Sequence, residues 1–201
     1  MHEWGNTMRD VHSWRKKKKT AKNYKFYAAV EWACEDDVGL QIQGSGFEYI
    51  LLDYKSNEAV VKVAEKSFRV GTIRLLKNKT SDKIWSEIDA WIGENTNPKY
   101  TYRIYGTGGN INKCHKLLGK QLDESISYRE IDDLYENLAK LSVTKRMLKY
   151  QLKADRADVI VPALQIYKYI MRSMKAKEIV VPKIGLVDGI IYDLYHQEIG
   201  F

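Results

Sequence analysis

The fold of this chain is decided by one stretch, Tyr102–Asn112, whose sequence is YRIYGTGGNIN. A short apolar run typical of a β-strand ends in a glycine turn, and a helical pattern follows. This order brings a backbone close to an anion, because glycine has no Cβ and the first N–H groups of a helix have no partner inside it. We therefore predict a phosphate site formed by Gly106, Thr107, Gly108, Gly109 and Asn110, with Lys113 one helical turn further on. In the alternative interpretation, the glycines only permit the backbone angles of the turn.

Length and composition set the limits for the rest of the chain. Its 201 residues, 44% of them hydrophobic, suffice for one large domain or two small ones. No apolar run approaches the roughly 20 residues of a spanning helix, and the N-terminus lacks the apolar core of a signal peptide. Two cysteines, Cys34 and Cys114, make no disulfide framework. We therefore expect a cytoplasmic protein that does not enter a membrane.

The chain is basic, with a formal net charge of +7, and part of the excess lies in one N-terminal run. The run consists of Arg15, Lys16, Lys17, Lys18 and Lys19. A positive surface favours anionic partners such as nucleotides, polyphosphate or nucleic acid. Such a run is most often a solvated segment, and an arm that binds nucleic acid is the alternative.

Hydrophobic periodicity predicts an α/β protein. Residues 1–46 have no clear pattern, acidic residues before Gly39 indicate a turn, and the break at Gly44–Gly46 places the start of a domain at residue 47. Within the domain, 47–201, we predict five strands, at 47–53, 58–64, 66–70, 99–105 and 178–181, the first three as an antiparallel meander. Helices are expected at 82–92, 111–119, from Ser127 onward, and at 143–152, 155–174 and 190–196. This order is typical of half of an actin-like, ribonuclease H-like ATPase fold, with a mixed five-stranded sheet and flanking helices.

Four stretches also carry a family resemblance. They are SFRVGTIRL at 67–75, GTGGNINK at 106–113, RADVIVPA at 156–163 and GLVDGII at 185–191. In this order and spacing they resemble the Ppx/GppA family of exopolyphosphatases and pppGpp phosphohydrolases. The resemblance covers residues 47–201 and implies Mg²⁺-assisted hydrolysis of a terminal phosphoryl group from polyphosphate or a guanosine nucleotide.

The chain departs from the family pattern at the loop that opens the family's second domain. In place of an Asp, a glycine-rich loop and Ser-Thr-Glu, the sequence at 53–58 reads DYKSNE. The resemblance implies that Asp53 helps to hold Mg²⁺ and that Ser56 and Asn57 contact phosphate; residues of a plain turn are the alternative.

The family's first domain, with its Asp-x-Gly-Ser-Asn loop, has no counterpart in residues 1–46. We therefore expect either a truncated or diverged chain, or a homo-oligomer or partner that supplies the missing half. Two further functions stay open: a catalytically inactive relative that binds nucleotide or a protein partner, and a basic nucleic-acid-binding protein.

Overall fold

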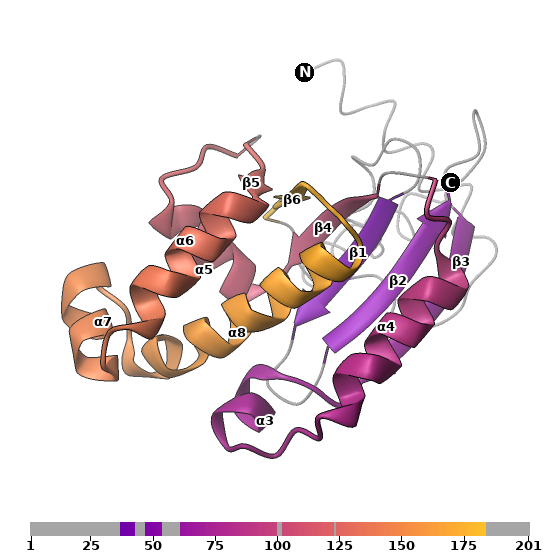
Figure 1. The fold of residues 1–201 in the computed structure, drawn as a ribbon. Coiled ribbons are helices and arrows are strands. Elements are labelled where there is room, and N and C mark those ends of the chain that lie inside the picture. The colour runs from indigo at the N-terminus through magenta and orange to yellow at the C-terminus, as the bar shows by residue number, and fades with distance from the viewer. Residues whose placement is uncertain (1–36, 43–46, 54–60, 100–101, 123, 184–201) are drawn as a thin grey trace, which may run out of the picture.

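The computed structural model describes residues 37–42, 47–53, 61–99, 102–122 and 124–183. These residues form an α/β domain around one mixed sheet of six strands in the order β3-β2-β1-β4-β6-β5 (Figure 1). The strands are β1 (Asp37–Ile42), β2 (Phe47–Asp53), β3 (Val61–Phe68), β4 (Arg103–Thr107), β5 (Ile126–Ser127) and β6 (Glu178–Val180). β1 pairs antiparallel with β2 and parallel with β4, and β6 is also parallel to β4. The meander β1-β2-β3 therefore continues into the parallel strands β4 and β6, and β5 pairs antiparallel with β6 at the edge.

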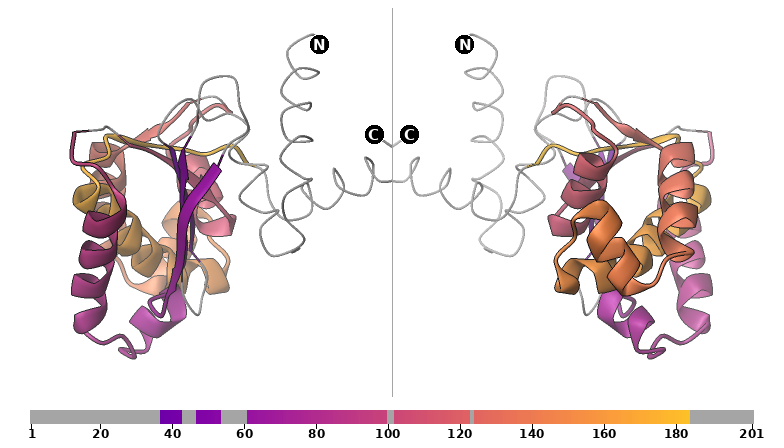
Figure 2. Two further views of the ribbon diagram at one scale, coloured as in Figure 1. Left: turned by 90° about the vertical axis from the view of Figure 1, so that its right-hand side faces the viewer. Right: turned by 90° about the vertical axis from the view of Figure 1, so that its left-hand side faces the viewer.

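Within the described residues, six helices accompany the sheet. They are α3 (Thr72–Leu76), α4 (Lys83–Asn95), α5 (Gly109–Leu117), α6 (Tyr128–Ala139), α7 (Val143–Tyr150) and α8 (Ala154–Ser173). α4 and α8 lie side by side over one face of the sheet, as Figures 1 and 2 show. Tyr169 Oη and Ser173 Oγ of α8 each donate a hydrogen bond to the Asp89 carboxylate of α4 at 2.6 Å. These two bonds link the helices.

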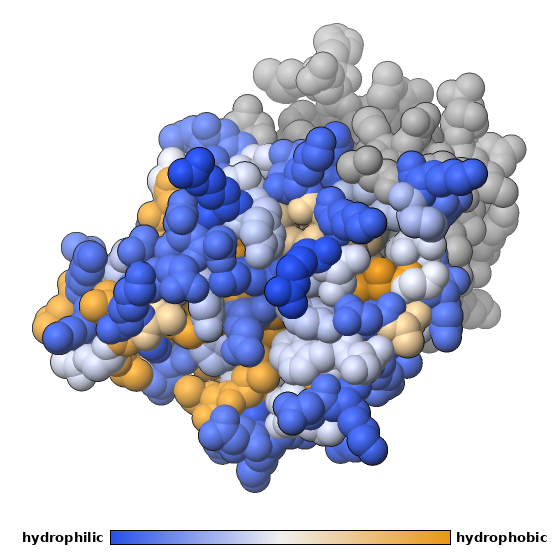
Figure 3. Space-filling model, in the orientation of Figure 1, coloured by the Kyte–Doolittle hydropathy of each residue, from blue (hydrophilic) through white to orange (hydrophobic). Residues whose placement is uncertain are grey.

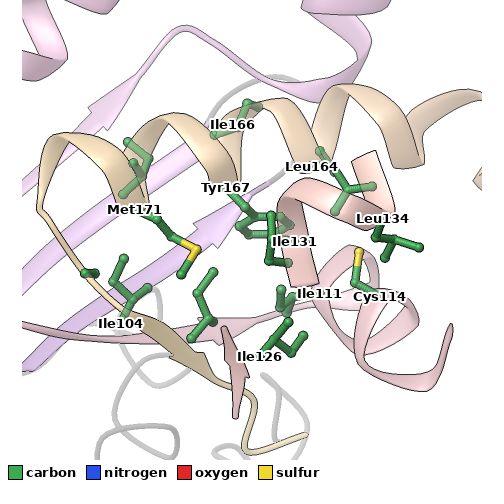
Figure 4. Packing of buried hydrophobic residues seen from close by; sticks show 14 of the residues in the cluster. Ile104, Ile111, Cys114, Ile126, Ile131, Leu134, Leu164, Ile166, Tyr167 and Met171 are labelled. Carbon is green, nitrogen blue, oxygen red and sulfur yellow. The ribbon is translucent and has the colours of Figure 1, made fainter. Parts of the chain in front are cut away.

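α8 is the centre of the hydrophobic core. Tyr167 points from α8 toward Ile111 of α5 and Ile131 of α6, and all three side chains are fully buried (Figure 4). Pro162 lies inside α8, is buried, and does not interrupt the helix. Because α8 contacts α3, α5, α6 and α7, it fixes the positions of the helices around the sheet.

The start of α6 confirms the predicted capping box. Ser127 Oγ accepts from the Glu130 N–H at 3.3 Å, and Glu130 Oε2 accepts from the Ser127 N–H at 2.9 Å. Lys120 Nζ lies 2.7 Å from Glu130 Oε1 and adds an ion pair. Two helix N–H groups that have no partner in the helix are satisfied in this way.

The expected five-stranded sheet is wrong, because the sheet has six strands. The expected turn around residues 35–39 is wrong as well: Asp37–Ile42 forms β1, which is paired on both sides, and sheet pairing overrides the local preference of its acidic residues and glycine. The two strands expected at 58–64 and 66–70 meet in one strand, β3, and the short elements β5 and α3 were not expected.

Several predictions fall outside the described residues. They concern the basic run at 15–19, the loop at 54–58, the family stretch GLVDGII at 185–191 and the helix at 190–196. The domain start at residue 47 remains a prediction, with β1 now on its N-terminal side. Within the described part of the chain, no helix combines the length and the apolar character that a membrane span requires.

Candidate phosphate-binding turn

The glycine turn joins the end of β4 to the start of α5. Gly108 has φ +101°, a backbone conformation that residues with a side chain rarely adopt. It is also the N-cap of α5, so no side chain caps this helix. The first N–H groups of α5 have no partner inside the helix, and the phosphate site expected at this turn stays a prediction.

Gly106 has a different role from Gly108. A Cβ at Gly106 would lie 2.9 Å from Ile179 Cγ2 and 3.0 Å from Ile111 Cγ1. Both distances are shorter than carbon atoms tolerate, so Gly106 lets β4 pack closely against β6 and α5. Gly106 therefore contributes to the site indirectly, since the close packing that it permits fixes the position at which the turn begins.

Arg156 brings a positive charge to the turn from the first turns of α8. Its Nη2 lies 2.7 Å from the position that a Cβ on Gly109 would occupy, and its Nη1 donates to Asn110 Oδ1 at 3.1 Å. Any side chain at residue 109 would push the guanidinium away. The third glycine of the turn therefore makes room for an arginine.

Two buried oxygens at the turn, Thr107 Oγ1 and Asn112 Oδ1, have no hydrogen-bond partner among the described residues. Thr107 ends β4 and is 3% exposed. A buried polar group without a partner costs free energy unless a ligand or water satisfies it. Both residues are neighbours of the turn glycines in the chain, so water or a bound group at the turn would satisfy these two oxygens.

The electrostatics of the turn favour an anion. The first turn of α5 contains no acidic residue, and its backbone dipoles place partial positive charge at Gly109 and Asn110. Arg156 adds a full charge, and Lys113, half-buried, follows one helical turn later. A phosphate group would meet N–H donors and one guanidinium there.

The strand register separates Asp53 from this turn. Val38 of β1 lies level with both Leu51 of β2 and Ile104 of β4. Asp53 is therefore level with Tyr102. The five residues from Tyr102 to Thr107 span about 17 Å along the strand direction, at roughly 3.3 Å per residue. If Asp53 binds a metal, it does so at the other end of the strands, and Ser56 and Asn57 lie outside the described residues.

The residues at the turn do not fit a Mg²⁺ ion held by the protein. Among the described residues they offer one hydroxyl and two amide oxygens, and the Arg156 guanidinium lies beside one of the amides. Magnesium is usually held by one or two carboxylates together with phosphate oxygens and water. The described residues also contain no cluster of three or more His, Cys, Asp or Glu side chains suited to a metal.

Cys114 on α5 is not a reactive thiol in this setting. The side chain is fully buried, and this burial raises the pKa of Cys114 to about 12. The neighbouring His115 is buried as well, and its Nε2 lies 2.8 Å from the Glu124 carbonyl oxygen. Neither residue supplies a nucleophile at the turn.

Sequence reasoning named Arg156 but did not include it among the phosphate ligands. The structure brings Arg156 into contact with Gly109 and Asn110. No local pattern connects residues 109 and 156, because only the fold brings them together.

The fold is an α/β arrangement that resembles the actin-like type, and a glycine turn follows its central strand β4. A scan against protein families matches residues 23–198 to the Ppx/GppA phosphatase family. The chain therefore belongs to the Ppx/GppA phosphatase family. A search of curated proteins found no match.

Solved structures show the same fold. An Aquifex aeolicus Ppx/GppA phosphatase is 17% identical, with a TM-score of 0.68 over 85% of this chain and 61% of the other. A Cytophaga hutchinsonii exopolyphosphatase is 18% identical, with a TM-score of 0.64 over 88% of this chain and 63% of the other. The chain thus spans less than two thirds of these proteins, and identities this low establish the fold alone.

Proposed function

We propose that the chain binds the phosphate groups of a phosphoanhydride, either inorganic polyphosphate or a guanosine polyphosphate, at the glycine turn. The observation that carries this proposal is the Arg156 guanidinium, which lies against Gly109 and is held by Asn110. A guanidinium beside the free N–H groups of a helix start is a combination that recognises phosphate. Membership of the Ppx/GppA family supports the choice of ligand.

Each residue has a separate part in this proposal. The backbone of Gly108 and Gly109 allows a phosphate to approach, and the N–H groups of the α5 start donate to its oxygens. Arg156 neutralises charge, and Asn110 keeps the guanidinium in place. The Thr107 hydroxyl, which is buried without a partner, can donate to a phosphate oxygen.

We also propose, from the family, that a terminal phosphoryl group is hydrolysed when Mg²⁺ is present. In the Ppx/GppA resemblance Mg²⁺ supplies charge neutralisation, and the described residues of the glycine turn would not hold the ion themselves. A catalytically inactive relative that binds the same ligand is the alternative. The predicted homo-oligomer or partner subunit belongs to this proposal too, and sedimentation velocity tests it.

Calorimetric titration of the full chain with polyphosphate and with a guanosine polyphosphate tests the binding. We expect Arg156→Ala to weaken binding about 10- to 100-fold, because a hydrogen bond to a charged group contributes roughly 1.5–3 kcal/mol. Asn110→Ala should weaken it less, since it removes the group that holds Arg156. Arg129→Ala is a matched control, because this arginine is exposed on α6.

Unchanged affinity in both site variants, or no binding by the wild type, would contradict the proposal. Phosphate release with Mg²⁺ then separates the two functions. Release that Arg156→Ala abolishes supports hydrolysis, whereas binding without release supports the inactive relative.

A further inference from the structure

The segment between α6 and α8 is basic without any acidic residue. From residue 137 to residue 154 the chain contains five cations and no Asp or Glu: Lys140, Lys145, Arg146, Lys149 and Lys153. Arg146 is engaged internally, with donations to backbone oxygens and with Asp158 nearby. The other four are exposed, and within the described residues none of them makes an ion pair.

α7 divides these residues into an inner and an outer face. Val143, Met147 and Tyr150 pack against the core. The outer face carries Lys145 and Lys149, one turn apart, and the neighbouring Leu148, whose exposed fraction is 78%. Like charges at this spacing repel each other, so an anion between them would relieve the repulsion. Figure 3 shows this end of the molecule as mainly hydrophilic with isolated hydrophobic side chains.

α7 is attached to the same part of α8 that carries Arg156. Arg146 Nη1 donates to the Ala157 carbonyl oxygen at 3.0 Å, so α7 lies against the first turn of α8. Lys153 is the N-cap residue of α8, three residues before Arg156. The one exposed acid in this first turn is Asp155. α7 and Lys153 are therefore linked to the glycine turn through the first turn of α8, which carries Arg156.

We propose that the outer face of α7, together with Lys153, binds the distal part of a long inorganic polyphosphate chain whose other end lies in the glycine turn. This inference rests on the proposed function and decides between its two ligands. Inorganic polyphosphate presents a uniform row of phosphates beyond the turn, whereas a nucleotide ends in its ribose and base. Lysines are point charges that suit a uniform chain of phosphates.

The same face does not suit single-stranded nucleic acid. Recognition of unpaired bases uses aromatic side chains as stacking platforms. The aromatic residue of α7, Tyr150, packs against the core, and the exposed positions of the helix hold threonine, lysine and leucine. A face that offers positive charge but no aromatic stacking platform therefore favours a phosphate polymer without bases over single-stranded nucleic acid.

Equilibrium binding of the full chain to tripolyphosphate and to long-chain polyphosphate, over a range of salt concentrations, tests this inference. The test variant is Lys145→Gln/Lys149→Gln. The matched control is Lys83→Gln/Lys177→Gln, which removes the same charge from exposed, unpaired positions outside α7. Thermal melting checks that both variants remain folded.

We expect the wild type to bind the long chain more tightly than tripolyphosphate. The α7 variant should reduce the slope of log K against log salt by about 1.4 for the long chain, since each neutralised charge contributes roughly 0.7. Its affinity for tripolyphosphate and the behaviour of the control should stay the same.

Three results would overturn the inference: no preference for the long chain, equal losses in the two double variants, or single-stranded RNA of equal charge binding as tightly. If the wild type binds neither polyphosphate, the proposed function itself fails. If tripolyphosphate binds and the long chain binds no better, only the inference about α7 fails.

Discussion

Arg146 offers the sharpest test of how the helices around the site are held together. Its Nε donates to the Leu138 carbonyl oxygen at 2.9 Å, and its Nη1 donates to the Ala157 carbonyl oxygen at 3.0 Å. One side chain on α7 thus links the end of α6 to the beginning of α8 through hydrogen bonds to a carbonyl oxygen of each helix. We predict that Arg146→Ala destabilises the fold far more than the loss of a surface arginine does.

The magnitude follows from the two bonds. A hydrogen bond to a charged group contributes roughly 1.5–3 kcal/mol, and the lower value applies because Arg146 is half-buried. Losing both bonds should reduce the free energy of unfolding by about 3 kcal/mol. In a chain of this size the melting temperature would then fall by roughly 6–12 °C.

Urea denaturation and thermal melting of three variants measure this effect. Arg146→Lys keeps the charge but not the two-pronged geometry, so we expect about half of the loss. Arg129→Ala is the control, because its side chain is 92% exposed and its pair with Asp133, at 3.9 Å, contributes less than about 0.5 kcal/mol. If Arg146→Ala lowers the free energy of unfolding no more than Arg129→Ala does, the two hydrogen bonds of Arg146 do not hold the helices together as we infer.

Two further predictions concern packing and pH. Gly106→Ala should lower the free energy of unfolding by roughly 1–3 kcal/mol, because its methyl group would overlap Ile179 and Ile111; a melting temperature equal to the wild type would show that the strand can shift. Burial tends to raise the pKa of Glu130, but hydrogen bonds from Lys120 and Ser127 outweigh burial and lower the pKa below 4.5. The capping contribution of Glu130, about 1 kcal/mol, should therefore be present at neutral pH and be lost as the pH falls below about 4.5. Urea titrations of Glu130→Gln and wild type should differ at pH 7 and converge in acid, and a constant difference would exclude the carboxylate as the cause.

Local patterns in the sequence predicted the elements that depend on neighbouring residues. The capping box at Ser127 and Glu130 spans one turn, and both of its hydrogen bonds are present. β2 has the predicted bounds, Phe47–Asp53, because its apolar run is continuous. The glycine turn lies between a strand and a helix, since glycine marks such a turn within a few residues.

Long-range pairing explains what the sequence could not predict. β1 contains residues that favour a turn, and only its position between β2 and β4 makes it a strand. β5 has two residues, too few to show any period. The distance between Asp53 and the glycine turn follows from strand register, and the contact of Arg156 with Gly109 joins residues that are distant in sequence.

The double pairing of β1 also has a consequence for the order of events during synthesis. β1 can pair with β2 as soon as the next few residues leave the ribosome, but its other partner, β4, follows only after α3 and α4. α6, α7 and α8 contact one another as consecutive elements, so their closure costs less chain entropy than the pairing of Asp37 with Arg103. Pulse-labelled hydrogen exchange should therefore protect the amides of α8 before those of the β1–β4 pair, and the nascent chain carries β1 with one open edge until β4 arrives.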